Sequence, residues 1–204
     1  MIRSLLFCLA LLQVFPIHSQ PLMRDVFAAM PDTLLPMVTR NNRLDCIDFI
    51  ENDMEARVRN KVDEYVTLEA LTPNYARFRT SASAFLELKL INDSLLCMVK
   101  TVEAGADSLR LQDSNIFFYT PEWKPLPTEH YFHMPVVEDF VATASLTADE
   151  ARVIEALRYF CPVRIALSPD APTLTLIPQT ADLDREQRPV AKRLLRELKI
   201  GVSI

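Results

Sequence analysis

The stretch that decides the fold covers residues 65–102 and reads YVTLEALTPNYARFRTSASAFLELKLINDSLLCMVKTV. Its apolar residues fall into four segments separated by turn-forming residues: Val66–Leu71, Ala76–Thr80, Phe85–Ile91 and Leu95–Val102. Short segments of this kind are typical of strands, and Asn92-Asp93 fits a two-residue hairpin turn. We therefore predict an antiparallel meander, which Leu109–Leu111 and Ile116–Tyr119 extend.

Helical spacing of apolar residues precedes this meander. Residues 23–30 carry apolar side chains three and four positions apart, and Pro31 ends the pattern. A longer pattern of the same spacing runs from Leu44 to Val62, and Asn42 with Asp45 fits the capping box that begins a helix. The sequence therefore predicts two N-terminal helices, the longer one beginning at Asn42.

Helical signals return after the meander. Thr147 and Glu150 form a second capping box at the start of a helix. Two strand-like segments, Val163–Leu167 and Leu174–Ile177, then predict a hairpin. A last helix is expected to run through Leu198, with Gly201 just past its end.

The predicted fold class is α+β, with a central antiparallel β-meander packed by N-terminal and C-terminal helices. Residues 20–204 are predicted to form a single domain, made of helices plus meander (20–120), a proline-rich crossover (121–146) and a helix-hairpin-helix unit (147–204). Ala70–Asn74 resembles Ala166–Asp170. A tandem helix-plus-hairpin repeat and the independent use of a proline turn both remain open.

Residues 1–19 have the organisation of a secretory signal peptide. Arg3 supplies a positive charge, Leu5–Val14 an apolar segment, and Ser19 a small residue at the cleavage position. The apolar segment is too short to span a bilayer, and no later segment approaches that length. We predict an exported protein of the periplasm or extracellular space, with no integral membrane segment after signal removal.

Composition excludes several classes of function. The 204 residues include only two glycines, Gly105 and Gly201. Phosphate-binding loops, dinucleotide fingerprints and the G-x-S-x-G nucleophile turn all need several glycines close together. The net charge of -5 argues against a nucleic-acid partner, because phosphate binding requires a basic surface. No cofactor is predicted.

The cysteine count leaves two alternatives. Cys46, Cys97 and Cys161 follow the predicted signal peptide, and export would permit disulfides. Three cysteines cannot all pair within one chain. Either all three are small apolar residues of the interior, or Cys97 and Cys161 form one bridge.

The residues that could carry catalysis form weak patterns. His130 and His133 stand beside Glu129, but their spacing differs from the helical HExxH motif, and the nearby prolines indicate a loop. Ser108 or Ser114 could join His130 and Asp107 or Asp113 in a triad, yet no glycine-rich turn presents the serine. We predict no metal site and no catalytic residue. A hydrolase acting on envelope or dietary polymer is the alternative function.

The most informative cluster is aromatic. Six of its members fall within residues 117–132: Phe117, Phe118, Tyr119, Trp123, Tyr131 and Phe132. Strand alternation should direct Phe118 to the face opposite Phe117 and Tyr119. One interpretation is a hydrophobic latch that ties the crossover to the sheet. The other is a binding groove for a protein segment or glycan, lined by Tyr119, Trp123, Tyr131 and His133.

The last predicted helix carries a basic stripe. Its members are Arg188, Lys192, Arg196 and Lys199. A solvated helix face that complements the helix dipole explains such a stripe. Docking to an acidic lipid or an acidic partner surface is the alternative.

Two segments resemble a known family. They are Met30–Pro36, continued by Asn41–Asp45, and Asp113–Tyr119 with Trp123 following. Together they are similar to an uncharacterised family of small exported proteins from Bacteroidetes, classed as a domain of unknown function. The resemblance covers the chain through about Phe140 and implies an extracytoplasmic role.

The same lineage implies O-glycosylation at Asp, then Ser or Thr, then an apolar residue. Thr33, Ser94 and Ser108 fit this pattern, and ordinary turn or cap residues fit it equally. The function predicted from the whole sequence is a non-catalytic binding or protein-interaction module of the cell envelope, whose partner is an envelope protein or glycan.

Overall fold

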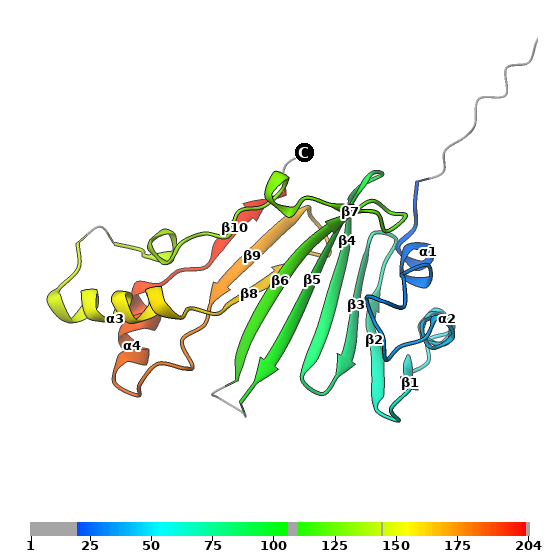
Figure 1. Ribbon diagram of the computed structural model, residues 1–204, viewed down its shortest axis with the longest axis horizontal. Helices are drawn as coiled ribbons and strands as arrows, with labels where there is room; N and C mark the ends of the chain where they lie inside the picture. Colours follow the sequence, from blue (N-terminus) through cyan, green and yellow to red (C-terminus); the bar gives the residue numbers. More distant parts are fainter. Residues whose placement is uncertain (1–19, 106–109, 144, 203–204) are drawn as a thin grey trace, which may run out of the picture.

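A seven-stranded antiparallel sheet forms the centre of the computed structural model, which describes residues 20–105, 110–143 and 145–202 (Figure 1). Its strands follow one another in chain order: β1 (Arg57–Arg59), β2 (Tyr65–Leu71), β3 (Tyr75–Ser81), β4 (Ala84–Asn92), β5 (Leu95–Ala104), β6 (Leu111–Tyr119) and β7 (Pro125–Leu126). The predicted meander and the α+β class are confirmed. Leu111 and Ile116–Tyr119, from the last two predicted segments, belong to one strand, β6, whereas Leu109 lies outside the described residues; β7 comes from the predicted crossover.

Side chains of the central strands are buried on both faces of this sheet. In β4, Leu86 and Leu88 belong to a core shared with the N-terminal helices. In β5, Cys97 and Val99 point the other way, into a core shared with the C-terminal part of the chain. Strand alternation therefore divides the interior into two cores, one on each side of the same sheet.

The first face is covered by α1 (Met23–Ala28) and α2 (Arg40–Glu51), as Figure 1 shows. Phe27 of α1 packs on Phe78 of β3, with ring centroids 5.2 Å apart. Burial of such aromatic side chains is a main source of stability for a helix docked on a sheet. The predicted short N-terminal helix is thus confirmed as part of the core.

The predicted limits of the longer helix are wrong at both ends. Thr39 is the N-cap, and its hydroxyl accepts from the Asn42 backbone N–H at 3.1 Å. Asn42 is therefore the third helical residue, and its side chain accepts from the Thr39 N–H at 3.0 Å. The helix ends at Glu51, because Asp53 turns into the left-handed region with φ 55°. Val58 belongs to β1 instead.

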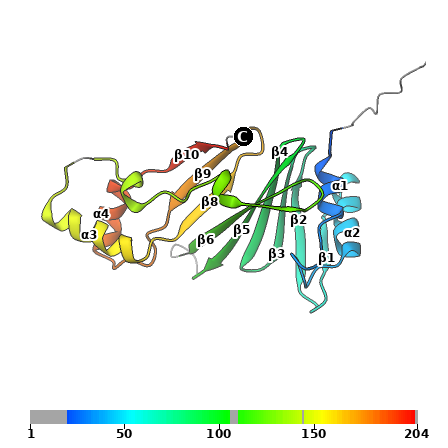
Figure 2. The same ribbon diagram turned by 45° about the horizontal axis from the view of Figure 1, so that its top comes forward.

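A three-stranded sheet covers part of the second face (Figure 2). It consists of β8 (Val163–Leu167), β9 (Thr173–Pro178) and β10 (Leu198–Gly201), with β9 in the middle. The predicted hairpin is confirmed as β8 and β9, where Leu167 pairs with Leu174. Between the sheets lies a core that includes Phe118 and Ile165.

The outer edge of β8 rests on side chains of the large sheet. The N–H groups of Val163 and Ile165 donate to Asp113 Oδ1 at 3.3 Å and to Ser114 Oγ at 3.0 Å. The backbone of Leu167 interacts with the Glu87 carboxylate on β4. Backbone N–H groups along this edge of β8 thus face side-chain acceptors of the large sheet, in place of the carbonyl groups that a neighbouring strand would supply.

Two further helices, α3 (Ala148–Tyr159) and α4 (Gln187–Leu194), pack against each other at the end of the smaller sheet (Figure 1). The predicted capping box of α3 is confirmed, because Thr147 accepts from the Glu150 N–H at 3.3 Å and Glu150 accepts from the Thr147 N–H at 2.9 Å. The predicted crossover contains two short 3-10 helices, η2 (Thr128–His130) and η3 (Val137–Phe140).

The predicted extent of the last helix is wrong. After Leu194 the chain becomes extended, and the Arg196 N–H donates to the Phe140 carbonyl at 2.8 Å. Residues Leu198–Gly201 then pair with β9 as β10. Hydrogen bonds to distant segments override the local helical pattern at these residues, so Gly201 ends a strand and not a helix.

Candidate functional site

The four residues of the predicted aromatic groove do not share one surface. Tyr119 and Trp123 belong to the core under α1, with ring centroids 5.4 Å apart. Tyr131 packs on Phe118, on the opposite side of the large sheet. His133 is exposed. The predicted alternation of Phe118 and Tyr119 is therefore confirmed, and ligand binding by this set stays a prediction.

Trp123 attaches the crossover to the first helix. Its indole N–H donates to the Val26 carbonyl at 2.8 Å, and the side chain is only 7% exposed. Its backbone has φ 65°, a left-handed conformation that costs an L-residue about 1–2 kcal/mol. This strain is retained because the buried ring and its hydrogen bond hold the residue in place. This geometry of Trp123 supports the interpretation of the aromatic cluster as a hydrophobic latch for the crossover.

The cysteines are free thiols in the part of the chain that the structure describes. Burial raises the pKa of Cys46 and of Cys161 to about 11, and it raises the pKa of Cys97 further. Thiols with raised pKa values contain little thiolate near neutral pH and are poor nucleophiles. The structure thus has the three unbridged cysteines of the first alternative.

The next feature is the placement of histidines and carboxylates among the described residues. Across the described ranges, no group of three or more His, Cys, Asp or Glu side chains is placed to hold an ion. Nor does any described helix have the length and apolar character needed to cross a bilayer. Of the predicted glycosylation positions, Thr33 and Ser94 are exposed, whereas Ser108 lies outside the described residues.

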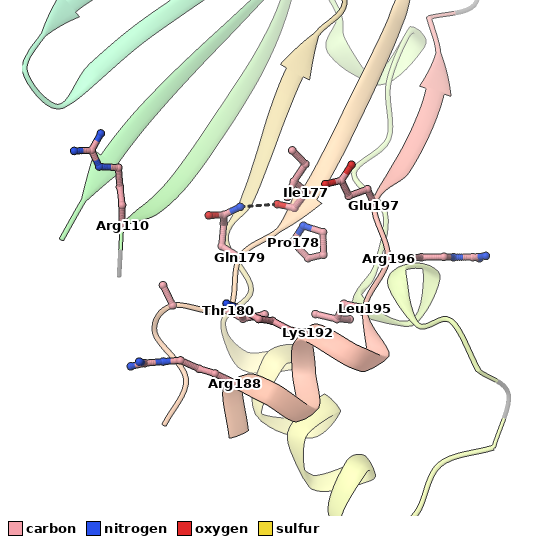
Figure 3. A pocket seen from close by; sticks show the side chains of 11 residues that line it. Arg110, Ile177, Pro178, Gln179, Thr180, Arg188, Lys192, Leu195, Arg196 and Glu197 are labelled. Atoms are coloured by element: carbon pink, nitrogen blue, oxygen red, sulfur yellow. Dashed lines mark hydrogen bonds between the residues drawn. The ribbon is translucent and has the colours of Figure 1, made fainter. Parts of the chain in front are cut away.

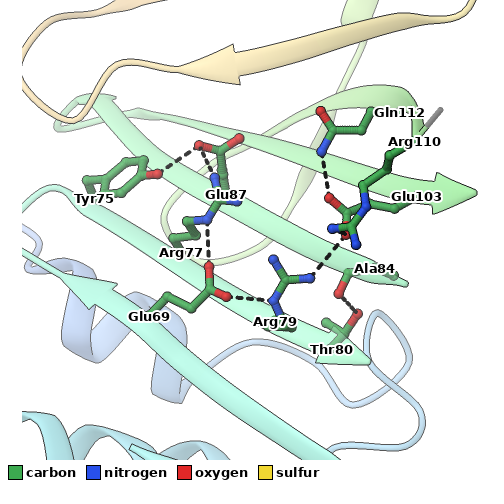
Figure 4. A network of polar contacts seen from close by, with 10 residues as sticks. All are labelled: Glu69, Tyr75, Arg77, Arg79, Thr80, Ala84, Glu87, Glu103, Arg110 and Gln112. Carbon is green, nitrogen blue, oxygen red and sulfur yellow. Dashed lines mark hydrogen bonds and ion pairs between the residues drawn. The ribbon is translucent and has the colours of Figure 1, made fainter. Parts of the chain in front are cut away.

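A polar network occupies the second face of the large sheet, beside the smaller sheet (Figure 4). Glu69 of β2 accepts from Nε of Arg77 at 2.7 Å and from Nε of Arg79 at 2.6 Å. Glu103 pairs with Arg79 at 3.3 Å and accepts from the Gln112 amide at 2.5 Å. These carboxylates are therefore held by cations and amides from neighbouring strands.

Glu87 is the most deeply buried carboxylate of this network. It accepts from the Tyr75 hydroxyl at 2.7 Å and lies 3.5 Å from Nη1 of Arg77. Burial raises the pKa of Glu87, and its interactions with Tyr75 and Arg77 offset only part of that effect. Because its side chain is 3% exposed, a polymer substrate could not reach it. The network reads as a structural element of the interface between the sheets, and not as an acid–base pair in a cleft.

A group of cations surrounds a cavity of about 500 Å³ between the end of β9, α4 and the start of β10 (Figure 3). Four basic residues line it: Arg110, Arg188, Lys192 and Arg196. Glu197 is the one carboxylate among the described lining residues. Ile177, Pro178 and Leu195 supply apolar surface between them. We call this cavity the basic pocket.

The cations of the basic pocket have few acidic partners. Arg110 lies 3.5 Å from Glu103. Within the described ranges, Arg188, Lys192 and Arg196 form no ion pair, although Nε of Arg188 donates to the Leu183 carbonyl at 2.7 Å. Like charges held together without counter-charges create a local positive potential, which attracts anions. The pocket size falls in the range of ligand sites.

Part of the basic pocket was foreseeable from sequence. Arg188, Lys192 and Arg196 are three of the four residues of the predicted stripe, although Arg196 follows α4 and is not part of it. The fourth, Lys199, lies on β10 and does not line the pocket. Arg110, next to β6, could not have been found, because no local pattern relates it to α4.

Comparison with known proteins places the chain in a family. Residues 15–200 match the family described as "Protein of unknown function (DUF3256)". The chain belongs to this family. A solved structure described as a domain of an uncharacterized protein from Porphyromonas gingivalis W83 is similar, with TM-score 0.69 and 26% identity over 87% of this chain and 91% of that one. No curated protein matches.

The DUF3256 match confirms the coarser part of the sequence resemblance. The family has no assigned function, and the similar structure comes from a bacterium of the Bacteroidetes. Export stays a prediction. The site is therefore argued from the geometry of this chain.

Replacing Trp123 tests its role as an anchor. Trp123→Ala should lower the free energy of unfolding by about 3 kcal/mol, because it removes a buried ring and leaves the Val26 carbonyl unpaired. Urea denaturation followed by circular dichroism measures this loss. Tyr159→Ala, at a side chain 84% exposed, should change stability by less than about 0.5 kcal/mol. Equal stability of both variants would contradict the anchor role.

Glu87 should make stability depend on pH. The pKa of Glu87 is raised on folding, so protonated Glu87 makes its full contribution to folding stability below the ordinary glutamate pKa of about 4.3. This contribution is lost as pH rises through the folded-state pKa. Glu87→Gln cannot ionise and keeps an acceptor for Tyr75. Its stability relative to wild type should therefore rise with pH, as measured by urea unfolding across the acidic-to-neutral range.

Glu69 provides the matched control with the opposite sign. Partial burial raises the pKa of Glu69, but hydrogen bonds from Arg79 and Arg77 outweigh this and lower it. The contribution of ionised Glu69 to folding stability is present above the pKa of the unfolded state and is lost as pH falls through the lower folded-state pKa. Glu69→Gln should therefore become less stable than wild type as pH rises. Parallel pH profiles for the two variants would show that Glu87 does not titrate as described.

Proposed function

We propose that this DUF3256 protein is a non-catalytic binding module of the cell envelope, and that its ligand is anionic and occupies the basic pocket. The observation that carries this proposal is the gathering of Arg188, Lys192 and Arg196 around one cavity, without acidic partners among the described residues. The whole chain has a net charge of -5. The cations around the cavity repel one another, and a bound anion would relieve this repulsion.

The geometry offers little support for the competing hydrolase. Glycosidic hydrolysis uses two carboxyl groups about 5–10 Å apart across a cleft. Glu197 is the sole carboxylate of the described pocket lining, and Glu69, Glu87 and Glu103 are engaged with arginines elsewhere. Binding without chemistry is the function that this distribution of charges favours.

The first residues of the sequence support the proposed placement in the envelope. Arg3, the apolar Leu5–Val14 and Ser19 form the pattern of an exported precursor. A periplasmic or extracellular location would expose the basic pocket to anionic polymers and proteins of the envelope. Amino-terminal sequencing of the protein purified from its own host should give a start near Gln20. A native protein that retains Met1 would contradict export.

Neutralising the basic pocket tests the binding proposal. The probes are tripolyphosphate, as a small anion, and polygalacturonate, as an anionic polymer, with neutral dextran as the uncharged reference. The Lys192→Gln/Arg196→Gln double variant should bind the anionic probes about 10- to 100-fold more weakly, because it removes two solvent-exposed charge contacts worth about 1 kcal/mol each. Isothermal titration calorimetry at low and high salt measures the affinity.

The matched control is Lys124→Gln/Arg40→Gln. These two cations are also exposed and, within the described part of the chain, form no ion pair. This variant removes the same charge and should bind like wild type. Failure of wild type to bind either anionic probe, or equal loss in both double variants, would overturn the proposed site.

A further inference from the structure

The cations of the basic pocket lie at its two ends instead of meeting at its centre. Figure 3 shows the side chains of Arg188 and Arg196 extending in opposite directions, with Lys192 between them and Arg110 on the Arg188 side. Arg188 comes from the first turn of α4, and Arg196 follows the helix end at Leu194. The residues from 188 to 194 rise about 9 Å along the helix axis.

This separation decides the size of the ligand. One phosphate or carboxylate group cannot contact guanidinium groups that leave opposite ends of α4 in opposite directions. A ligand that uses both Arg188 and Arg196 must carry negative groups at separate positions along its length. It must also cross the apolar surface formed by Ile177, Pro178 and Leu195.

The surroundings of the pocket discriminate among extended polyanions. β9 is the middle strand of its sheet, so both of its edges are occupied and a peptide strand could add only at the outer edge of β10. The described lining contains no aromatic side chain on which a nucleic-acid base could stack. None of the large exposed apolar side chains of the described chain lines the pocket, so it lacks groups that insert into a membrane.

Sugar chains meet the remaining requirements. The Thr180 hydroxyl lies in the lining, and the apolar side chains of Pro178 and Leu195 offer a surface for the C–H face of a sugar ring. Arginine side chains pair with carboxylate or sulfate groups in a bidentate manner. Repeated anionic sugars thus match the alternation of cation, apolar surface and cation across the pocket.

We infer that the ligand of the basic pocket is an acidic polysaccharide that lies along α4 and places anionic groups of different sugar units on Arg188 and Arg196. This inference rests on the proposed function and adds the substrate class. Binding is multivalent: each arginine contributes a weak contact, and one chain joins them at a high effective concentration. Affinity therefore depends on the length of the chain.

The test is a length series of galacturonate oligomers, measured by titration calorimetry. The hexamer should bind at least tenfold more tightly than the monomer, after correction for the number of equivalent positions on the hexamer. Arg188→Gln and Arg196→Gln should each reduce hexamer affinity about tenfold while changing monomer affinity by less than threefold. Arg188→Lys keeps the charge but not the bidentate fork, so it should lose less hexamer affinity than Arg188→Gln, which separates binding from the structural contact of Arg188 with Leu183.

Each alternative ligand gives a different result. Equal affinity for monomer and hexamer, or tighter binding of tripolyphosphate than of the hexamer, would overturn the polysaccharide inference and leave the anion-binding function standing. Tighter binding of hexaglutamate than of the sugar hexamer would overturn it in favour of an acidic peptide. A sulfated oligosaccharide of the same length, compared with the galacturonate hexamer, identifies the preferred anionic group. If none of these probes binds, the proposed function fails as well.

Discussion

The contact between the β8 edge and the face of the large sheet determines how the rest of the molecule is arranged. The backbone N–H of Ile165 is buried at this contact and that of Val163 is partly buried, so both need acceptors. Asp113 and Ser114 of β6 provide these acceptors, and Glu87 of β4 faces the backbone of Leu167, further along β8. Losing one such acceptor would leave a buried donor unpaired, at a cost of about 1–3 kcal/mol. This row of polar side chains is what fixes the smaller sheet at one position on the larger one.

The position of the basic pocket follows from that contact. β8 holds β9 through backbone pairing, and β9 is followed by the chain that leads to α4. The cations Arg188 and Lys192 are thereby brought to the end of the large sheet where Arg110 precedes β6. Lys89 of β4 adds a second tie, because its ammonium group donates to the Pro169 carbonyl in the β8–β9 turn. The basic pocket is thus assembled from segments that only the packing of the two sheets brings together.

Sequence patterns identified the parts of this structure that depend on local chemistry. The meander, the Thr147 capping box and the β8–β9 hairpin follow from strand alternation, turn residues and capping, which act between neighbours in the chain. Leu198–Gly201 continued a helical pattern in sequence but formed β10, because pairing with β9 satisfies its backbone. Trp123 could be recognised as important but not as buried, since a cluster of aromatic residues fits a core and a binding surface equally well. The basic stripe was visible, whereas the contribution of Arg110 depended on the fold.

The scarcity of glycine has a structural consequence for recognition. Left-handed backbone positions, which glycine occupies without strain, are taken here by Asp53, Asp63 and Trp123 as well as by Gly105. A non-glycine residue has fewer accessible backbone states in the unfolded chain, so such turns are more restricted than glycine turns of the same shape. At Trp123 this restriction coincides with a buried ring that binds the crossover to α1. The separation of the two sheets, and with it the backbone positions of the cations in the basic pocket, is set by the contacts of β8 with β6. A fixed separation of charges favours a ligand whose own charges repeat at regular intervals, because neither partner then loses much conformational freedom on binding.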